Sequence, residues 1–199
     1  MSEITLFPSS KHLLPQGRLA VTIAEDRYIH MIKQSLAEKQ DFALCMLNES
    51  EEHDEIKKIP AIATKGIIVD FNSDECGLLS VIIEGQQKIR LLSIQIAKNG
   101  LLIAKYEPYP TWDTAPIDNA TACLSKKLKL FYATLPEIGA LYPTPAYNDI
   151  TWVCQRWLEI LPLEVHYKQL LITQENTKLT IRFLLKLLDN NEIPTTELI

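Results

Sequence analysis

The sequence predicts an α+β fold in which a β-rich first half, carrying one helix, precedes a helical second half. Short runs rich in Ile, Val and Leu recur before residue 107, whereas apolar residues recur every three or four positions after residue 116. Between them, prolines crowd residues 107–116 and disfavour both helix and inner strand. We therefore expect a first subdomain at residues 1–110, a second at 116–190, and a frayed tail at 191–199.

In the first half we expect one helix and several strands. Thr22-Ile23-Ala24-Glu25 has the form of a capping box and is followed by apolar residues at helical spacing, which predicts a helix over residues 25–37. The strand-like runs are 42–47, 61–71, 78–84, 88–96 and 101–106. Asn99-Gly100 suits a type I′ turn, so the last two runs should pair as an antiparallel hairpin.

In the second half the spacing predicts a bundle of helices. Leu124, Leu128, Phe131 and Leu135 form one apolar stripe. A second stripe runs from Ile150 to Leu161 and stops at Pro162. Two further helices are predicted at 164–172 and 177–188. The last has such a wide apolar face that we expect it to be the buried member of the bundle.

Composition and charge exclude several classes of protein. The chain has 199 residues, of which 47% are apolar and 23% charged, and this excludes collagen-like, coiled-coil and disordered chains. A net charge of -5 offers no positive field to a phosphate backbone, so no nucleic-acid partner is expected. The chain starts without a signal-peptide pattern, and no apolar run approaches the ~20 residues that span a bilayer. We expect a cytoplasmic protein with no membrane partner.

Residue patterns that carry chemistry are missing from the sequence. The four cysteines are dispersed without a C-x-x-C pair, and the four histidines are scattered, so we expect no metal site. Neither a phosphate-binding glycine loop nor a G-x-S-x-G elbow occurs, so we expect no cofactor and no catalytic residues. Cys45 lies in an apolar run and is interpreted as structural, whereas Cys76 is expected on a turn. The acidic segment 48–55 is interpreted as a solvated loop, with pH sensing by His53 as the alternative.

Three aromatic residues near the proline-rich segment are the candidate binding residues. Tyr106, Tyr109 and Trp112 alternate with prolines at the junction of the two halves. Such rings contribute large apolar area at low entropic cost, so they suit a stacking wall for an extended peptide. The alternative is that they wedge the two halves together.

Several blocks of sequence, in order, resemble the N-terminal domain of Lon proteases, most closely its bacterial stand-alone versions. The first blocks are Leu6-Phe7-Pro8, residues 13–19 and residues 23–28. The likeness continues through Ile59-Pro60, residues 63–71 and the strand-turn-strand block 79–90. In the helical half it covers the helix–proline–helix block 157–163 and residues 168–171. The resemblance thus spans nearly the whole chain.

The resemblance implies a barrel-like β-rich first half with one helix packed on it, followed by an α-helical bundle. It also implies a non-enzymatic module that binds unfolded or exposed hydrophobic polypeptide segments, because the family's ATPase and Ser-Lys protease domains lie outside this region. The alternatives are an adaptor or assembly protein that docks on a folded partner such as a protease or chaperone, and a cryptic hydrolase. The sequence leaves the clients, the oligomeric state and the exact groove residues open.

Overall fold

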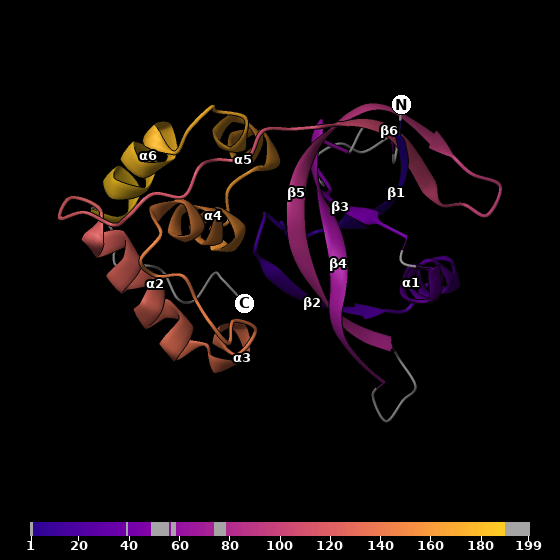
Figure 1. Cartoon of the computed structure of the whole chain (residues 1–199), viewed down its shortest axis with the longest axis horizontal. Helices are drawn as coiled ribbons and strands as arrows, with labels where there is room; N and C mark the ends of the chain where they lie inside the picture. Colours follow the sequence, from indigo (N-terminus) through magenta and orange to yellow (C-terminus); the bar gives the residue numbers. More distant parts are fainter. Residues whose placement is uncertain (1, 39, 49–55, 57–58, 74–78, 190–199) are drawn as a thin grey trace. The chain divides into compact units, whose positions relative to one another are not determined.

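The structure is a computed structural model that describes residues 2–38, 40–48, 56, 59–73 and 79–189 (Figure 1). The chain divides into two compact units, residues 1–110 and 111–199. Some expectations fall outside the described residues: the acidic segment from 49 to 55 with His53, the turn at Cys76, and the tail 191–199.

In its described residues, the first unit contains a six-stranded sheet and one helix, α1 (Asp26–Glu38). Its strands are β1 (Ser2–Ser9), β2 (Arg18–Ile23), β3 (Phe42–Met46), β4 (Ile62–Ser73), β5 (Leu79–Ile96) and β6 (Leu102–Pro108). They follow the order β2-β5-β4-β3-β1-β6, and β6 also pairs with β5. That pairing closes β5, β4, β3, β1 and β6 into a ring, with β2 added beside β5. The expected α+β class and the barrel-like first half are confirmed.

Two apolar clusters hold the first unit together. In one, Tyr28, Met31 and Ile32 of α1 pack with Val81 and Ile83 of β5, which fixes the helix on the sheet. The other gathers small and aliphatic residues from several strands: Ile4, Leu6, Ala43, Cys45, Ile59, Ala63, Ile89, Leu102 and Ala104. The strand residues in both clusters follow from the alternation of side chains along a strand, which sends every second residue inward.

Long-range pairing produced elements that local patterns did not predict. β1 and β2 were not expected, yet β1 pairs with both β3 and β6 and therefore helps to close the ring. The runs 78–84 and 88–96 are one continuous strand, β5, because β4 pairs with it across Gly85. A strand can thus continue through a glycine and polar residues when its partner continues too.

Two local predictions were wrong in detail. Thr22 lies in β2 opposite Ser80, so it does not cap α1; the helix instead begins on the carbonyl of Glu25, which accepts from Tyr28 and Ile29 N–H at 3.0 Å. The hairpin of β5 and β6 is confirmed, but its turn is not type I′. Gly100 has φ 78°, whereas Asn99 is not among the positive-φ residues of the described chain.

The hairpin turn has a different hydrogen-bond pattern. Gly100 N–H donates to Ala97 at 2.9 Å, and Ala97 N–H donates to Leu101 at 2.8 Å. This is a three-residue loop in which a glycine in the left-handed region follows a four-residue turn, the second common form of tight hairpin. The guanidinium of Arg27 at the start of α1 donates to the Gly100 carbonyl at 2.8 Å and so ties the turn to the helix.

The second unit contains α2 (Ala122–Thr134), the short α3 (Pro136–Gly139), α4 (Ile150–Ile160), α5 (Val165–Ile172) and α6 (Lys178–Asp189). The buried member is α4, whose residues from Ile150 to Leu158 are all buried and which packs on α2 and α6. The expectation that the last helix is the buried one was wrong. Of its predicted apolar face only Leu184 and Leu188 are buried, and Leu179 is exposed.

The proline-rich segment after Pro110 is fastened to the second unit. Thr151 donates its hydroxyl to the carbonyl of Asp113 at 2.5 Å, and Ala115 N–H donates to the carboxylate of Asp149 at 3.1 Å. Ile150 N–H donates in turn to the Ala115 carbonyl at 2.8 Å. Asp149 also caps α4 by accepting from Thr151 N–H, so one carboxylate orients both the segment and the helix.

Candidate polypeptide-binding surfaces

Tyr106 and Tyr109 both belong to the first unit, at the end of β6 and just after it. Tyr106 is half-buried, packs against an apolar cluster, and has the Lys65 ammonium 5.9 Å from its ring centre. Tyr109 N–H donates to the Lys88 carbonyl at 3.0 Å, and the guanidinium of Arg90 lies 4.9 Å from its ring centre. The two rings therefore keep part of their surface accessible, and each contacts cations, the usual neighbours of aromatic faces.

Trp112 lies in the second unit and is buried, with 6% of its surface exposed. Its indole N–H donates to the carbonyl of Gln174 at 2.7 Å, at the turn that follows α5. Within its own unit, Trp112 therefore anchors the proline-rich segment. Neither the stacking-wall nor the wedge interpretation of the three aromatics is tested by these contacts, so both remain predictions.

An open strand edge is the most exposed apolar feature of the first unit. Among the described residues, the part of β4 beyond Gly66 pairs with β5 alone, because β3 reaches only to Gly66. Ile67, Val69 and Phe71 on this part are 41%, 38% and 61% exposed. β5 carries β2 on its other side along this stretch, so the open side belongs to β4 (Figure 1). We call residues 67–73 the β4 edge; on one side it has no strand partner in the described chain, and it carries exposed apolar side chains.

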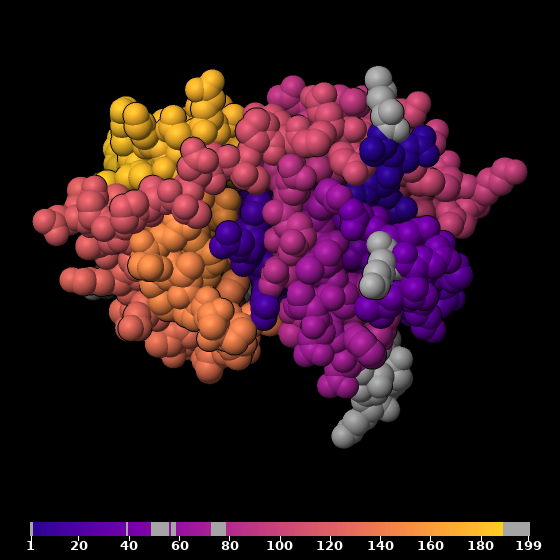
Figure 2. Space-filling view, viewed as in Figure 1, coloured from indigo at the N-terminus to yellow at the C-terminus, as the bar shows by residue number. Residues whose placement is uncertain are grey.

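A second open segment lies on β5, at residues 92–96, which pair only with β6 in the described chain. Leu92 and Ile96 there are exposed, the latter at 58%. The segment leads into the β5–β6 hairpin, whose tip projects in Figure 2. It is shorter than the β4 edge and carries fewer exposed apolar side chains. The edge of β2 is short as well, and its exposed residues are Ala20 and Thr22.

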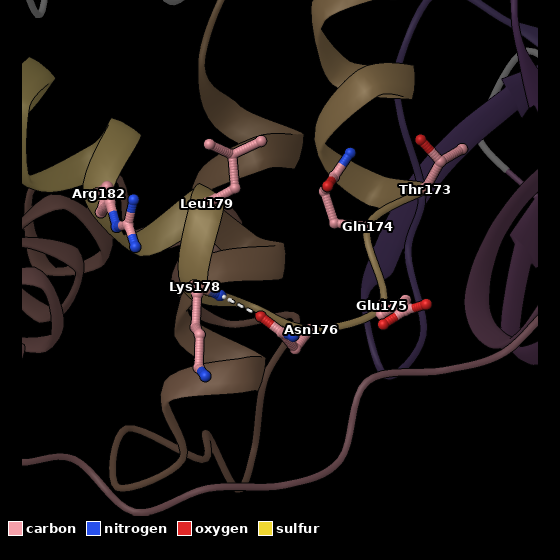
Figure 3. Close-up of a pocket in the computed structure, with 7 residues that line it drawn as sticks. All are labelled: Thr173, Gln174, Glu175, Asn176, Lys178, Leu179 and Arg182. Carbon is pink, nitrogen blue, oxygen red and sulfur yellow. Dashed lines mark hydrogen bonds between the residues drawn. The ribbon is translucent and has the colours of Figure 1, made fainter.

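The second unit contains a depression between the end of α5 and the start of α6, with a volume of about 410 Å³ (Figure 3). Its walls are mostly polar and include two cations, Lys178 and Arg182, together with Leu179. The complete lining is Thr173, Gln174, Glu175, Asn176, Lys178, Leu179 and Arg182. We call it the α5–α6 depression. Because Trp112 donates to the Gln174 carbonyl, the proline-rich segment supports one wall of it.

The buried thiols have the character of core residues. Burial raises the pKa of Cys45 and of Cys154 to about 12, so neither is a thiolate near neutral pH. Cys45 is buried in an apolar cluster, as its structural interpretation predicts. In the part of the chain that the structure describes, no three His, Cys, Asp or Glu side chains are grouped to hold a metal ion. Within that same part, no helix is both long and apolar enough to cross a bilayer.

Sequence patterns contain only weak signals for the β4 edge and the α5–α6 depression. The run Ile67-Ile68-Val69 is apolar at consecutive positions, so it lacks the alternation that separates an inner face from an outer one. Lys178, Arg182 and Lys186 recur every four residues, which places them along one side of α6. That spacing was the available signal for a basic wall. The depression itself depends on how the α5–α6 turn folds.

Comparison with known proteins identifies the family. The model of the ATP-dependent protease La (LON) substrate-binding domain matches residues 3–190. No curated protein matches the chain significantly. The fold is similar to the crystal structure of a Lon N-terminal domain protein from Xanthomonas campestris. That match has a TM-score of 0.72 at 19% identity and covers 94% of this chain and 98% of that one.

A second similar structure is the N-terminal domain of Mycobacterium avium complex Lon protease. The TM-score is 0.63 at 13% identity, over 96% of this chain and 100% of that one. Both likenesses extend through the β-rich and the helical unit, since they cover nearly the full length of each chain. The family match spans the same two units, and the chain therefore belongs to the LON substrate-binding domain family.

Proposed function

We propose that this chain binds unfolded polypeptide and that the β4 edge receives an extended segment of it. Membership of a substrate-binding family supports a polypeptide as the partner. The observation that carries the site is the combination, along residues 67–73, of a side that no described strand pairs and of the exposed Ile67, Val69 and Phe71. On this stretch the Phe71 N–H donates to the Asp70 carboxylate at 2.9 Å. A folded protein has few free strands to offer such an edge, whereas an unfolded chain has many.

Two interactions would act together at the β4 edge. Backbone N–H and C=O groups of the bound segment would extend the sheet, which gives affinity for any sequence. Apolar side chains of the segment would cover the exposed ones of β4 at ~25 cal/mol per Å² of apolar surface removed from water. The proposal involves no catalytic step. We also propose that the chain works in a reducing compartment, because its buried cysteines Cys45 and Cys154 are free thiols.

The test is fluorescence anisotropy of a labelled, permanently unfolded protein titrated with this chain, next to the same protein in its folded form. We expect saturable binding of the unfolded form alone. Equal binding of the folded form would favour an adaptor that docks on folded partners. Absence of binding to either up to high micromolar concentration would contradict the proposal.

A pair of matched substitutions locates the site. Phe71→Lys places a charge on the β4 edge, and Ile96→Lys places the same charge on the open β5 segment at nearly equal exposure, 61% against 58%. We expect Phe71→Lys to weaken binding by about tenfold and Ile96→Lys to leave it within about twofold. The reverse order would move the site to the β5–β6 hairpin.

We also propose Tyr106 and Tyr109 as contributors to peptide binding, with Trp112 acting through the fold of its unit. Tyr109→Ala should weaken binding without a large change in melting temperature, because the ring is only partly buried. Trp112→Ala should lower the melting temperature, because it removes a buried indole and its hydrogen bond to Gln174. If Trp112→Ala instead weakens binding while the melting temperature is unchanged, Trp112 contacts the peptide directly, as the stacking-wall interpretation predicts.

A further inference from the structure

The α5–α6 depression is lined by two cations, Lys178 and Arg182, and by one anion, Glu175. Lys178 and Arg182 are exposed and take part in no ion pair among the described residues. One helical turn separates them, so both side chains leave the same side of α6. Figure 3 shows them on the α6 side of the depression, with Glu175 at the opposite side. On a chain of net charge -5, this is a local concentration of positive charge.

The turn that shapes the depression is fixed by hydrogen bonds, so the cations stand on an ordered base. Asn176 accepts from Lys178 N–H at 3.1 Å, at the start of α6. Gln174 donates its side-chain amide to the Leu170 carbonyl at 2.9 Å and receives the indole N–H of Trp112 on its own carbonyl. The depression is therefore organised before any ligand arrives, which lowers the entropic cost of binding.

We infer that the α5–α6 depression binds the carboxylate side chains of an acidic polypeptide segment that also carries apolar residues. Arg182 suits a carboxylate because its planar guanidinium can donate two parallel hydrogen bonds, and Lys178 adds a point charge. Leu179, 41% exposed between the two cations in sequence, provides the apolar contact. The inference rests on the proposed function, since it adds a charge preference to the binding of polypeptides.

The charge complementarity favours this occupant over others. A neutral apolar segment would leave both cations uncompensated, and a basic segment would be repelled by them. An anionic segment would gain from both, with an affinity that falls as salt increases because the site is open to solvent. Acidic stretches between apolar residues are the class of client that the depression should select.

Two labelled peptides provide the test, one with alternating glutamate and leucine and the other with glutamine in place of every glutamate. Both are titrated by anisotropy at low salt against the intact chain. We expect the glutamate peptide to bind about tenfold more tightly, and the difference to shrink at high salt. Equal affinities for the two peptides would overturn the inference.

Variants of the cations test the location. In Lys178→Gln with Arg182→Gln, the preference for the glutamate peptide should disappear. The matched control, Lys126→Gln with Lys129→Gln on α2, changes the net charge equally at exposed positions outside the depression and should keep it. If Lys178→Gln with Arg182→Gln still prefers the glutamate peptide, the assignment of the site to the α5–α6 depression is overturned. The charge-reversal variant Lys178→Glu with Arg182→Glu should bind a lysine–leucine peptide more tightly than the glutamate peptide. That result would show that a protein changed at both positions still folds and binds peptides.

The unfolded protein used above separates this inference from the proposed function. Suppose that this chain binds the unfolded protein, that Phe71→Lys weakens this binding, and that both peptides bind equally. The β4 edge is then supported, and the depression is excluded as a site for acidic segments. If neither unfolded protein nor peptide binds, both proposals are contradicted together. Binding of the glutamate peptide alone would support the depression and contradict the β4 edge.

Discussion

Two lysine side chains lie inside the protein, where a charged ammonium is least favourable. Lys88 is 1% exposed and Lys168 is 3% exposed, and burial lowers the pKa of each to about 8. Lys168 retains one polar contact, to the carbonyl of Glu159 at 3.4 Å. The buried guanidinium of Arg156 is better compensated, because Glu159 holds it at 2.7 and 3.0 Å.

Lys168→Met should stabilise the protein at neutral pH, and its advantage over the wild type should disappear as pH rises. With a folded pKa of about 8 against 10.5 for the free side chain, the folded state loses its proton first as pH rises. Below pH 8 the buried ammonium therefore lowers the free energy of unfolding by its full amount. This destabilisation is lost between about pH 8 and 10.5, as the folded state gives up the proton. Chemical denaturation should show an advantage for the variant of at most about 3 kcal/mol at pH 7, shrinking across that window. An advantage independent of pH would contradict this account.

Thr180 carries a buried neutral polar group, a hydroxyl that has no hydrogen-bond partner among the described residues. It is fully buried on α6, and its hydroxyl makes no hydrogen bond among the described residues. Thr180→Val keeps the shape and removes the unsatisfied group, so we expect no loss and a gain of up to about 1 kcal/mol in the free energy of unfolding. The matched control is Thr151→Val, which deletes the hydroxyl that donates to Asp113 at 2.5 Å and should cost about 1–2 kcal/mol. Equal effects of the two substitutions would contradict this interpretation.

At the scale of elements, periodicity predicted where most strands and helices lie, and tertiary contacts decided how they start, stop and merge. The stripes through Leu128 and Val153 predicted α2 and α4 because a buried helix face must repeat every three or four residues. The capping prediction for Thr22 failed because pairing of β2 with β5 claimed that residue for a strand. Pairing of this kind joins residues some sixty positions apart, which a local pattern does not contain.

Gly85 shows why β5 continues where the sequence suggested a break. A Cβ atom at this position would stand 2.2 Å from the carbonyl oxygen of Leu14, so the loop before β2 packs directly on the strand. The contact is held by Gln16 N–H, which donates to Gly85 at 2.7 Å, and by Gly85 N–H, which donates to Gly17 at 2.9 Å.

Gly85→Ala should therefore destabilise the first unit by more than about 2 kcal/mol, because backbone atoms must move to admit the methyl group. Gly100→Ala is the control: its nearest neighbour would be 3.6 Å away, and only the positive φ of 78° opposes it. We expect the melting temperature to be highest for the wild type, lower for Gly100→Ala and lowest for Gly85→Ala. A larger effect at Gly100 would show that the loop adapts more easily than the hairpin turn.

At the scale of the whole molecule, the sequence predicted the α+β class and the family, but not the surfaces available for binding. β4 is open beyond Gly66 because β3 begins at Phe42, opposite Gly66, and a local sequence pattern does not contain that register. Likewise, Lys178 and Arg182 were visible as a basic stripe, yet the hollow beside them exists only once the α5–α6 turn is folded. Of the aromatics chosen from the sequence, Trp112 contacts the wall of that hollow through Gln174.

All three tryptophans of the chain, Trp112, Trp152 and Trp157, are buried in the second unit. Intrinsic emission excited selectively from tryptophan therefore reports on the helical unit alone, while the β-rich unit is silent in that signal. If the two units melt separately, emission and circular dichroism will give different midpoints; a single shared midpoint would mean that they unfold together. Because the indole N–H of Trp112 is hydrogen-bonded to the Gln174 carbonyl on the wall of the hollow between α5 and α6, we expect its emission to change when the acidic test peptide binds there.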